Sequence, residues 1–184
     1  MKRAFVFLFF LLPLAACAAE PLTLFGAPLK GATRAELRQV LVKAGFAPNR
    51  VDDKYFCDNY AVRGQLKGAS QLSVCYTEGD NKFATAEYTF PGFMNMDLVK
   101  HVIAMVETKY GRPNGLSGDF GLGPVVARWV EPQGMQVKVS RGWPDTTTYL
   151  DLADKANAAR MNAQIHRDQQ QRVQQQAHHD ANAF

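Results

Sequence analysis

Two cysteines constrain this chain more than any other feature, because both fall in segments with the composition of β-strands. Segments 55–62 and 71–77 are rich in aromatic and β-branched residues, and the residues between them include two glycines, as a turn requires. A hairpin built from these segments places Cys57 directly opposite Cys75. Opposed residues on antiparallel strands have Cβ atoms about 4.5–5.5 Å apart, close to disulfide geometry. The sequence therefore predicts a disulfide between neighbouring strands, which stabilises by about 3 kcal/mol in the chain-entropy estimate.

The same register assigns residues to the two faces of the predicted sheet. A second turn at residues 79–81 returns the chain through a third strand, residues 82–90. Both cysteines then lie on the outer face, and Asp58 lies on the inner face, where we expect a partner such as Arg63 or a strand-end amide. The predicted apolar inner face consists of Leu72, Val74, Tyr76, Ala84, Ala86, Tyr88 and Phe90.

Two helices are predicted from their end signals. Thr33 and Glu36 have the spacing of a capping box and precede apolar residues at helical spacing, which end at Gly45. A second amphipathic pattern covers residues 96–110 and ends before Gly111, which a proline follows two residues later.

Further strands complete the expected fold. Residues 22–26 form a short first strand or an extended segment, and residues 125–130, 135–139 and 146–152 have strand patterns. Residues 114–123 are rich in glycine and are interpreted as a connecting loop. The predicted fold class is α+β, with an antiparallel sheet of two three-stranded meanders, two helices on one face and a polar C-terminal helical tail.

The two predicted helices end alike. Residues 43–49 and 109–114 both close a helix with glycine and continue into Pro-Asn. This similarity suggests an internal duplication, but the common use of glycine and proline at helix ends accounts for it more readily.

The first 19 residues predict export. A basic start and an apolar run of residues 4–12 are typical of a secretory signal, and the run is shorter than the ~20 residues of a spanning helix. Leu14-Ala15-Ala16-Cys17 resembles the lipobox of bacterial lipoproteins, which implies a lipidated, palmitate-bearing Cys17 at the outer membrane. Alternatively, cleavage after Ala18 leaves a soluble periplasmic protein. Either outcome leaves Cys57 and Cys75 as an even pair in an oxidising compartment.

The mature chain divides into a folded domain and a tail. Residues 20–152 are long enough for one domain with a core, and they contain 15 basic and 14 acidic residues, so the formal charge of +4 of the whole chain indicates no nucleic-acid surface. Residues 153–184 are rich in alanine and glutamine without a continuous apolar stripe. We expect a solvated helix over residues 154–172 that frays into a disordered end.

No pattern of catalytic or metal-binding residues is apparent. His101 has no neighbouring carboxylate or cysteine in sequence, and the serines lack a nucleophile-elbow context. Cys57 and Cys75 are 18 residues apart, unlike the closely spaced cysteines of redox motifs. We therefore expect no enzymatic activity, no cofactor, no metal and no small-molecule substrate.

One helix start carries a resemblance to known families. Gly31-Ala32-Thr33-Arg34-Ala35-Glu36-Leu37 resembles the Gly-x-Thr-x-x-x-(Val/Leu) segment of BamE/SmpA-type outer-membrane lipoproteins and of repeats in β-lactamase-inhibitory proteins. The resemblance implies helices on one face of an antiparallel sheet and a role in protein contact. This chain departs from those families at Ala32, where they commonly have methionine, and it has no cysteine pair in its second half.

The expected function is that of a non-enzymatic cell-envelope lipoprotein acting as an interaction or scaffold module. The expected partners are an envelope protein and, through the lipid, the membrane. The alternative is a periplasmic inhibitor or immunity protein that blocks an enzyme with a protruding loop at 111–123. The candidate interaction residues in this loop are Gly111, Arg112, Asn114, Asp119 and Phe120.

Overall fold

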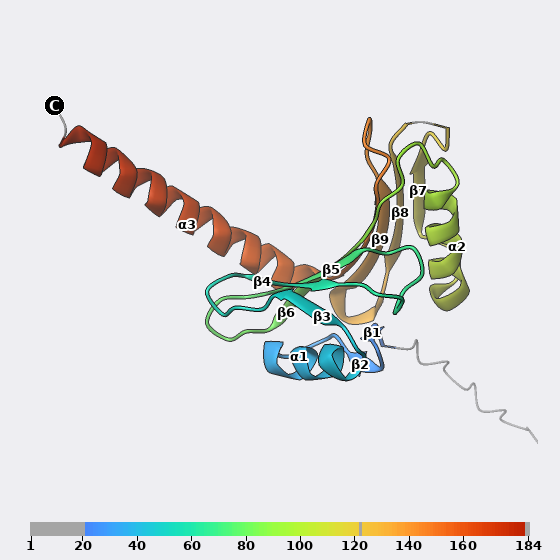
Figure 1. The fold of residues 1–184 in the computed structure, drawn as a ribbon, viewed down its shortest axis with the longest axis horizontal. Coiled ribbons are helices and arrows are strands. Elements are labelled where there is room, and N and C mark those ends of the chain that lie inside the picture. The colour runs from blue at the N-terminus through green and yellow to red at the C-terminus, as the bar shows by residue number, and fades with distance from the viewer. Residues whose placement is uncertain (1–20, 122, 183–184) are drawn as a thin grey trace, which may run out of the picture.

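The computed structural model describes residues 21–121 and 123–182. The predicted signal and Cys17 lie outside these residues. The chain forms an eight-stranded antiparallel sheet (Figure 1). Helices α1 (Arg34–Lys43) and α2 (Leu98–Tyr110) pack on one face, and α3 (Lys155–Ala181) begins against the other face and extends away from it.

The order of the strands in the sheet is β3-β4-β5-β6-β10-β9-β8-β7, all antiparallel, and β1 (Thr23–Leu24) with β2 (Ala27–Pro28) forms a separate small hairpin. A 3₁₀ turn, η1 (Pro132–Gly134), connects β8 to β9. The eight strands are β3 (Ala47–Arg50), β4 (Cys57–Ala61), β5 (Gln71–Tyr76), β6 (Phe83–Phe90), β7 (Gly115–Gly118), β8 (Val125–Val130), β9 (Met135–Arg141) and β10 (Thr148–Asp154).

The same order of one helix and four strands occurs twice along the chain. A helix and four strands, α1-β3-β4-β5-β6, are followed by α2-β7-β8-β9-β10, and β6 pairs with β10 at the centre. The α+β class with an antiparallel sheet is confirmed, but the expectation of two three-stranded meanders is wrong. The additional strands, β3 and β7, escaped prediction because they are four residues long and largely exposed, so neither alternates between apolar and polar residues.

The predicted register of the cysteine strands is confirmed. Cys57 lies opposite Cys75, and the two form a disulfide on the face away from α1 and α2. One detail of the faces was wrong: Ala84 does not join the main core. A shift in register between Cys75 and Tyr76 turns Phe83 into the core, and Ala84 packs beside Cys75 on the opposite face.

A row of facing residues crosses all eight strands beneath the helices. Six of its eight members are buried, and α1 and α2 add buried leucine, valine and isoleucine side chains above it. Only the two members at the sheet edges are exposed. From one edge to the other, the row is Pro48, Tyr60, Leu72, Tyr88, Leu150, Val139, Ala127 and Leu116.

Asp58 is fully buried, and its partners come from α1 rather than from Arg63. The capping box of Thr33 and Glu36 forms as predicted and sets the start of α1. Arg34 and Arg38, one turn apart, both reach the Asp58 carboxylate, with Nη2–Oδ1 of 2.7 Å and Nε–Oδ2 of 2.8 Å respectively. Arg63 was the wrong expectation because a helix packed over the strand supplies cations directly above the carboxylate.

The two guanidinium groups keep Asp58 ionised. Burial alone raises the pKa of this carboxyl, but the hydrogen bonds and charges of Arg38 and Arg34 outweigh it and hold the pKa below its ordinary value. Asp53 adds a second carboxylate, 2.8 Å from Arg38 Nη1, and the Arg34 guanidinium lies over the ring of Tyr76 at 5.0 Å. The cluster thus attaches α1 to the sheet through neutralised buried charge.

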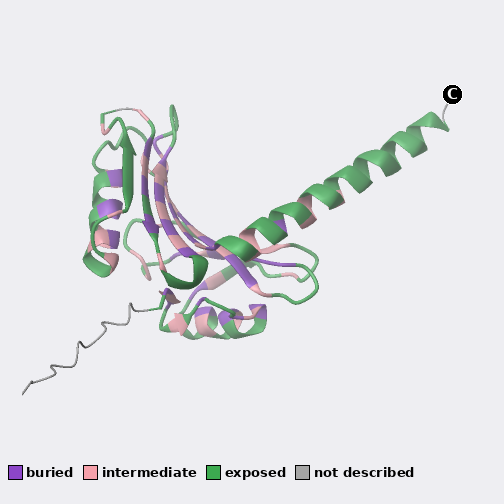
Figure 2. Cartoon of the chain, turned by 180° about the vertical axis from the view of Figure 1, so that it is seen from behind, coloured by how far each residue is buried: buried purple, intermediate pink, exposed green. Residues whose placement is uncertain are grey.

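The first turns of α3 pack on the sheet instead of remaining solvated. Asp154 caps the helix by accepting hydrogen bonds from the amides of Ala156 and Asn157. Met161 is buried over Cys75 and Ala84, so the helix covers the disulfide face. Figure 2 shows that most of the helix beyond this contact is exposed.

The helix continues to Ala181, past the expected fraying point, and Arg160 pairs with Asp80 at 2.6 Å near its start. Across residues 21–121 and 123–182, no helix combines the length and the apolar composition that crossing a bilayer requires.

Asp58→Asn should destabilise the protein by roughly 3 kcal/mol, because it leaves two guanidinium groups facing a neutral amide in a buried position. Urea denaturation monitored by circular dichroism measures the loss. The matched control is Asp53→Asn, whose side chain is 77% exposed, and which should cost less than about 1 kcal/mol. Equal losses in the two variants would contradict the role of burial.

Met161→Ala should cost about 2–3 kcal/mol, since it removes the only buried side chain among the described residues of α3. Val173→Ala, in the exposed part of the same helix, should leave the free energy of unfolding unchanged within about 0.5 kcal/mol. Thermal and urea unfolding of both variants test this. An unchanged midpoint for Met161→Ala would show that α3 does not pack on the sheet in solution.

Candidate interaction surface

Three loops meet at one end of the second half of the sheet. The register aligns the ends of five strands there, in the row Phe90, Thr148, Arg141, Val125 and Gly118. The described residues of the loops that leave these ends are 91–97, 119–121 with 123–124, and 142–147, which we call the Arg141 loop cluster. Figure 1 shows them together beside the start of α2.

Arg141 holds the cluster together from inside. Its side chain is 1% exposed, and all of its hydrogen-bond acceptors are main-chain carbonyls. Nη2 donates to the carbonyls of Asp119, Gly121 and Gly123 at 2.8, 2.9 and 2.7 Å, and Nη1 donates to that of Met96 at 3.3 Å. A buried cation thus connects the 91–97 loop to the loop that begins at Asp119. Arg141 is also the last residue of β9, so the 142–147 loop begins directly after it.

A second bond connects the 142–147 loop to the 91–97 loop, since the hydroxyl of Thr146 donates to the carbonyl of Gly92. Thr146 is also buried, at 2% exposure. The bonds that join the loops to one another are therefore made by two buried side chains, and their acceptors are main-chain carbonyls.

Large apolar side chains cover the outside of the same loops. The exposed fractions are 90% for Phe93, 67% for Met94, 44% for Met96 and 57% for Trp143. Met94 also has a positive φ of 53°, a strained conformation for a residue with a side chain. Aromatic residues and methionine are enriched at protein interfaces, so four such exposed side chains on two linked loops are typical of a binding surface.

Of the five predicted interaction residues, Asp119 and Phe120 lie in the Arg141 loop cluster, whereas Gly111, Arg112 and Asn114 precede β7 at its opposite end. Residues 115–118 form β7, so the connecting loop is shorter than predicted. The carbonyl of Gly111 accepts a hydrogen bond from Trp129 Nε1, and Asn114 Oδ1 accepts one from the amide of Val130, which fix the chain before β7.

The other three predicted residues differ in their surroundings. Asp119 belongs to the Arg141 loop cluster, and Phe120 packs partly against the core. Arg112 remains exposed. The predicted segment therefore supplies one loop of the surface and the strand beside it.

Sequence reasoning did not identify Arg141, Met94 or Met96 as site residues. A signal for Arg141 was present: Met135, Val137 and Val139 alternate into the core, and Arg141 continues their parity. A charged residue at an inward position must find buried acceptors, so this parity predicts a structural arginine. The apolar loop residues had no comparable signal, because exposure depends on the packing of neighbouring loops.

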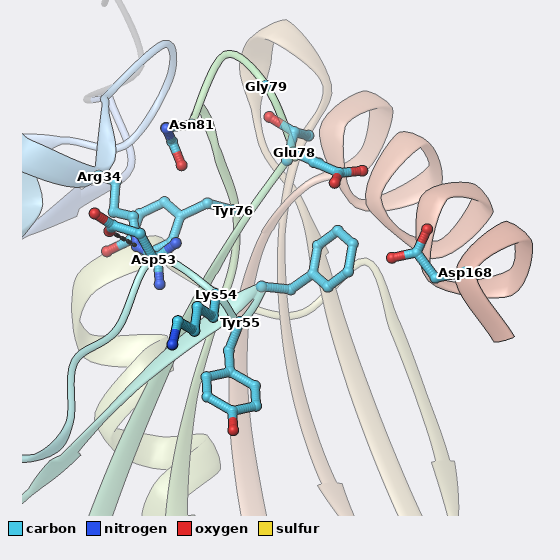
Figure 3. Close-up of a pocket in the computed structure, with 11 residues that line it drawn as sticks. Arg34, Asp53, Lys54, Tyr55, Tyr76, Glu78, Gly79, Asn81 and Asp168 are labelled. Carbon is cyan, nitrogen blue, oxygen red and sulfur yellow. Dashed lines mark ion pairs between the residues drawn. The ribbon is translucent and has the colours of Figure 1, made fainter. Parts of the chain in front are cut away.

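The corresponding end of the first half is hollow rather than filled. The cavity measures about 230 Å³ and lies between the 52–56 loop, the 77–82 turn and α3 (Figure 3). Arg34 and Tyr76 line one side, and Glu78 and Asp168 line the other. Among the described residues that line it there is no histidine, cysteine or serine.

A polar row occupies the outer face of the central strands. Glu87 lies opposite Asp151, which lies opposite Lys138, and the Lys138 amine is 2.9 Å from the Asp151 carboxylate. Burial, followed by the neighbouring Asp151 carboxylate, raises the pKa of Glu87 to about 7. Glu87 therefore carries a fractional charge at neutral pH.

Among the described residues, the loop cluster, the cavity and the polar row contain no histidine and no group of side chains that could hold a metal ion. His101 lies exposed on α2. Within residues 21–121 and 123–182, no group of three or more histidine, cysteine, aspartate or glutamate side chains could hold a metal ion.

Comparison with known proteins adds one structural likeness. No protein-family model and no curated protein matches the sequence. Among solved structures, a DUF4309 family protein (YjgB) from Bacillus subtilis is similar, with a TM-score of 0.43 and 14% sequence identity over 70% of this chain and 82% of that chain. At that level the likeness shows neither a family nor a function.

Glu87→Gln should flatten the pH dependence of stability. The folded pKa of about 7 lies above the ordinary value of 4.5, so the protonated group favours the folded state below about pH 4.5, and this contribution is lost as the pH rises through 7. The variant should therefore be more stable than wild type at pH 8, by roughly 1 kcal/mol after allowance for screening. Urea denaturation from pH 4 to 8 measures this.

The control for that titration is Glu78→Gln, which removes an exposed carboxylate. Its curve should run parallel to that of the wild type. A Glu87→Gln curve that also runs parallel would show that Glu87 titrates normally.

Proposed function

We propose that the protein is a non-enzymatic interaction module of the cell envelope, which binds a protein partner through the Arg141 loop cluster. The observation that carries this proposal is the exposure of Phe93, Met94 and Trp143 on loops fixed from within by Arg141. Each such side chain gains about 1.5–3 kcal/mol when it is fully buried, so a partner that covers the cluster obtains substantial binding free energy.

Prior ordering of the loops strengthens the proposal. Binding normally loses about 0.5–1.5 kcal/mol for each side chain that becomes immobile, with a further cost for ordering loops. The main-chain bonds from Arg141 and Thr146 meet part of this cost in the free protein. Methionine in the same patch adapts to different partner shapes. The combination suits recognition of another protein's surface.

The proposed location is the periplasmic face of the outer membrane, with a lipid on Cys17, or the periplasm if the chain is released by ordinary cleavage. The disulfide between Cys57 and Cys75 supports export, because disulfides persist in oxidising compartments and are rare in the cytosol. The resemblance of residues 14–17 to a lipobox supports the lipid anchor.

The inhibitor alternative is less well supported by the described geometry. It relied on a protruding loop at 111–123, but residues 115–118 belong to the sheet, and Arg141 binds the carbonyls of Asp119 and Gly123. A scaffold needs only a fixed surface, which this arrangement provides.

Partner capture with surface variants tests the proposed function. The double variant Phe93→Ser, Trp143→Ser should reduce in-cell crosslinking to envelope proteins at least tenfold, since it removes the apolar contact area. The matched control is Val42→Ser, Val173→Ser, which changes two other exposed apolar residues on α1 and α3. Thermal unfolding confirms that all variants fold. Identical crosslinking patterns for the two double variants would refute the assigned surface.

Intact mass of the mature protein, with and without reductant, tests the location. We expect a chain that begins at Cys17 and carries lipid, and a gain of two hydrogen masses on reduction as the disulfide opens. A mass that corresponds to cleavage after Ala18 would replace the lipoprotein by the soluble form. Retention of residues 1–16 would contradict export by either route.

A further inference from the structure

The two edges of the eight-stranded sheet differ in how they are protected. Pro48 in β3 and Leu116 in β7 occupy the two ends of the row that crosses the sheet. An exposed sheet edge presents main-chain N–H and C=O groups that can pair with another strand. Figure 1 shows β7 at the outer edge, beyond β8.

The hydrogen-bond pattern shows which main-chain groups of β7 face outward. The amide of Asp119 donates to the carbonyl of Pro124, and these two residues continue the β7–β8 register as a hydrogen-bonded pair. Pairs alternate along an antiparallel ladder, so Ser117 and Gly115 also bond towards β8. The N–H and C=O groups of Leu116 and Gly118 therefore point away from the sheet.

The same reasoning places Pro48 at an outward position in β3. The amide of Val62 donates to the carbonyl of Ser70, which makes Tyr60 bond towards β5 and leaves Pro48, opposite Tyr60, facing out. Proline has no N–H, so the outward donor is missing at this edge. A register shift between Pro48 and Arg50 interrupts the edge further.

None of these protective features occurs in β7. Its sequence, Gly-Leu-Ser-Gly, contains no proline and no charge, its pairing with β8 has no register shift, and all four residues are exposed. Natural sheets commonly use proline, charge or bulges to prevent edge pairing. In the first half, β3 has a proline and a register shift. The equivalent strand of the second half, β7, has neither.

We propose that β7 receives an extended segment of a partner protein as a ninth strand of the sheet. The inference rests on the proposed interaction function and names the form in which the partner binds. Main-chain hydrogen bonds to Leu116 and Gly118 supply the pairing, and side chains on alternate residues supply the specificity.

The chemistry of the two faces defines the segment. On the helix face, Leu116 is 52% exposed at the end of the apolar row, so an apolar residue beside it extends the core. On the outer face, Gly115 has no side chain and lies opposite the exposed Arg128. Among the described residues, neither Arg128 nor the nearby Arg112 pairs with a carboxylate. The segment therefore alternates apolar and acidic residues.

The length of the edge favours a peptide segment over a second copy of this chain. Four residues span about 14 Å at the usual rise of a strand. A stable dimer generally buries at least about 1,000 Å² with good complementarity, which pairing along four residues alone does not supply. An extended segment needs no comparable area, because it can continue over the neighbouring loops.

The experiment uses the full mature chain and a fluorescein-labelled peptide, Thr-Val-Glu-Val-Glu-Val-Thr, in a fluorescence anisotropy titration. A peptide with lysine in place of both glutamates is the comparison. Leu116→Pro gives β7 the protection that β3 has, without removing a β7–β8 hydrogen bond, and Leu116→Ala retains the amide. We expect Leu116→Pro to weaken binding at least tenfold, Leu116→Ala by about threefold, and the lysine peptide to bind at least fivefold more weakly.

A second measurement uses the wild-type protein, so its result does not depend on whether the Leu116→Pro variant folds. Amide hydrogen exchange followed by NMR should slow at least tenfold at Leu116 and Gly118 when the glutamate peptide is saturating, while amides of β3 remain unchanged. Protection elsewhere, or equal affinity for the two peptides, would overturn the proposal. So would a concentration-dependent dimer that Leu116→Pro abolishes, because the occupant would then be a second copy.

This test is separable from that of the proposed function. The Phe93→Ser, Trp143→Ser variant should bind the peptide as the wild type does, because neither residue lies in β7. If partner capture proves independent of the loop cluster while the peptide still protects Leu116, the loop assignment fails alone. If the loop variant loses its partner and the peptide does not bind, the strand assignment fails alone.

Discussion

The structure depends on the antiparallel pairing of β6 with β10, which runs from Phe90 opposite Thr148 to Thr85 opposite Ala153. This pairing joins two halves, each with a helix and four strands, into one sheet with a continuous apolar face. Because the central strands are antiparallel, the two halves point in opposite directions, and their equivalent loops lie at opposite ends of the sheet. The pairing also makes β3 and β7 the outer strands. The positions of both the loop cluster and the open edge follow from this single contact.

Each half contains a buried arginine system, but the two are neutralised in different ways. In the first half, Arg34 and Arg38 pair with the buried Asp58, so opposite charges attach a helix to the sheet. In the second half, Arg141 binds only main-chain carbonyls, so dipoles of the loops surround the cation. The first arrangement leaves a charged hollow beside α3. The second fills the end of the sheet from within and leaves apolar side chains outside, which makes it the better surface for a partner.

Local sequence patterns predicted the elements whose signals are complete within a few residues. The capping box at Thr33 and Glu36, the strand segments around Cys57 and Cys75, and the register between them were confirmed. The short strands β3 and β7 were missed, because their residues are exposed and belong to the sheet only through a neighbour. The partner of Asp58 was wrong for the same reason: Arg34 and Arg38 are 24 and 20 residues away and reach it only when α1 packs. The loop cluster was predicted only in part, through Asp119 and Phe120.

The sequence by itself determined the class of fold, the covalent link between two strands and the register of those two strands, because strand periodicity, turn residues and cysteine spacing act over short distances. Only the tertiary structure decided which strands became edges, which charges were neutralised and which apolar residues remained exposed. These properties depend on the order of strands in the sheet, and that order is set by contacts such as β6 with β10, between residues about 60 positions apart in the chain.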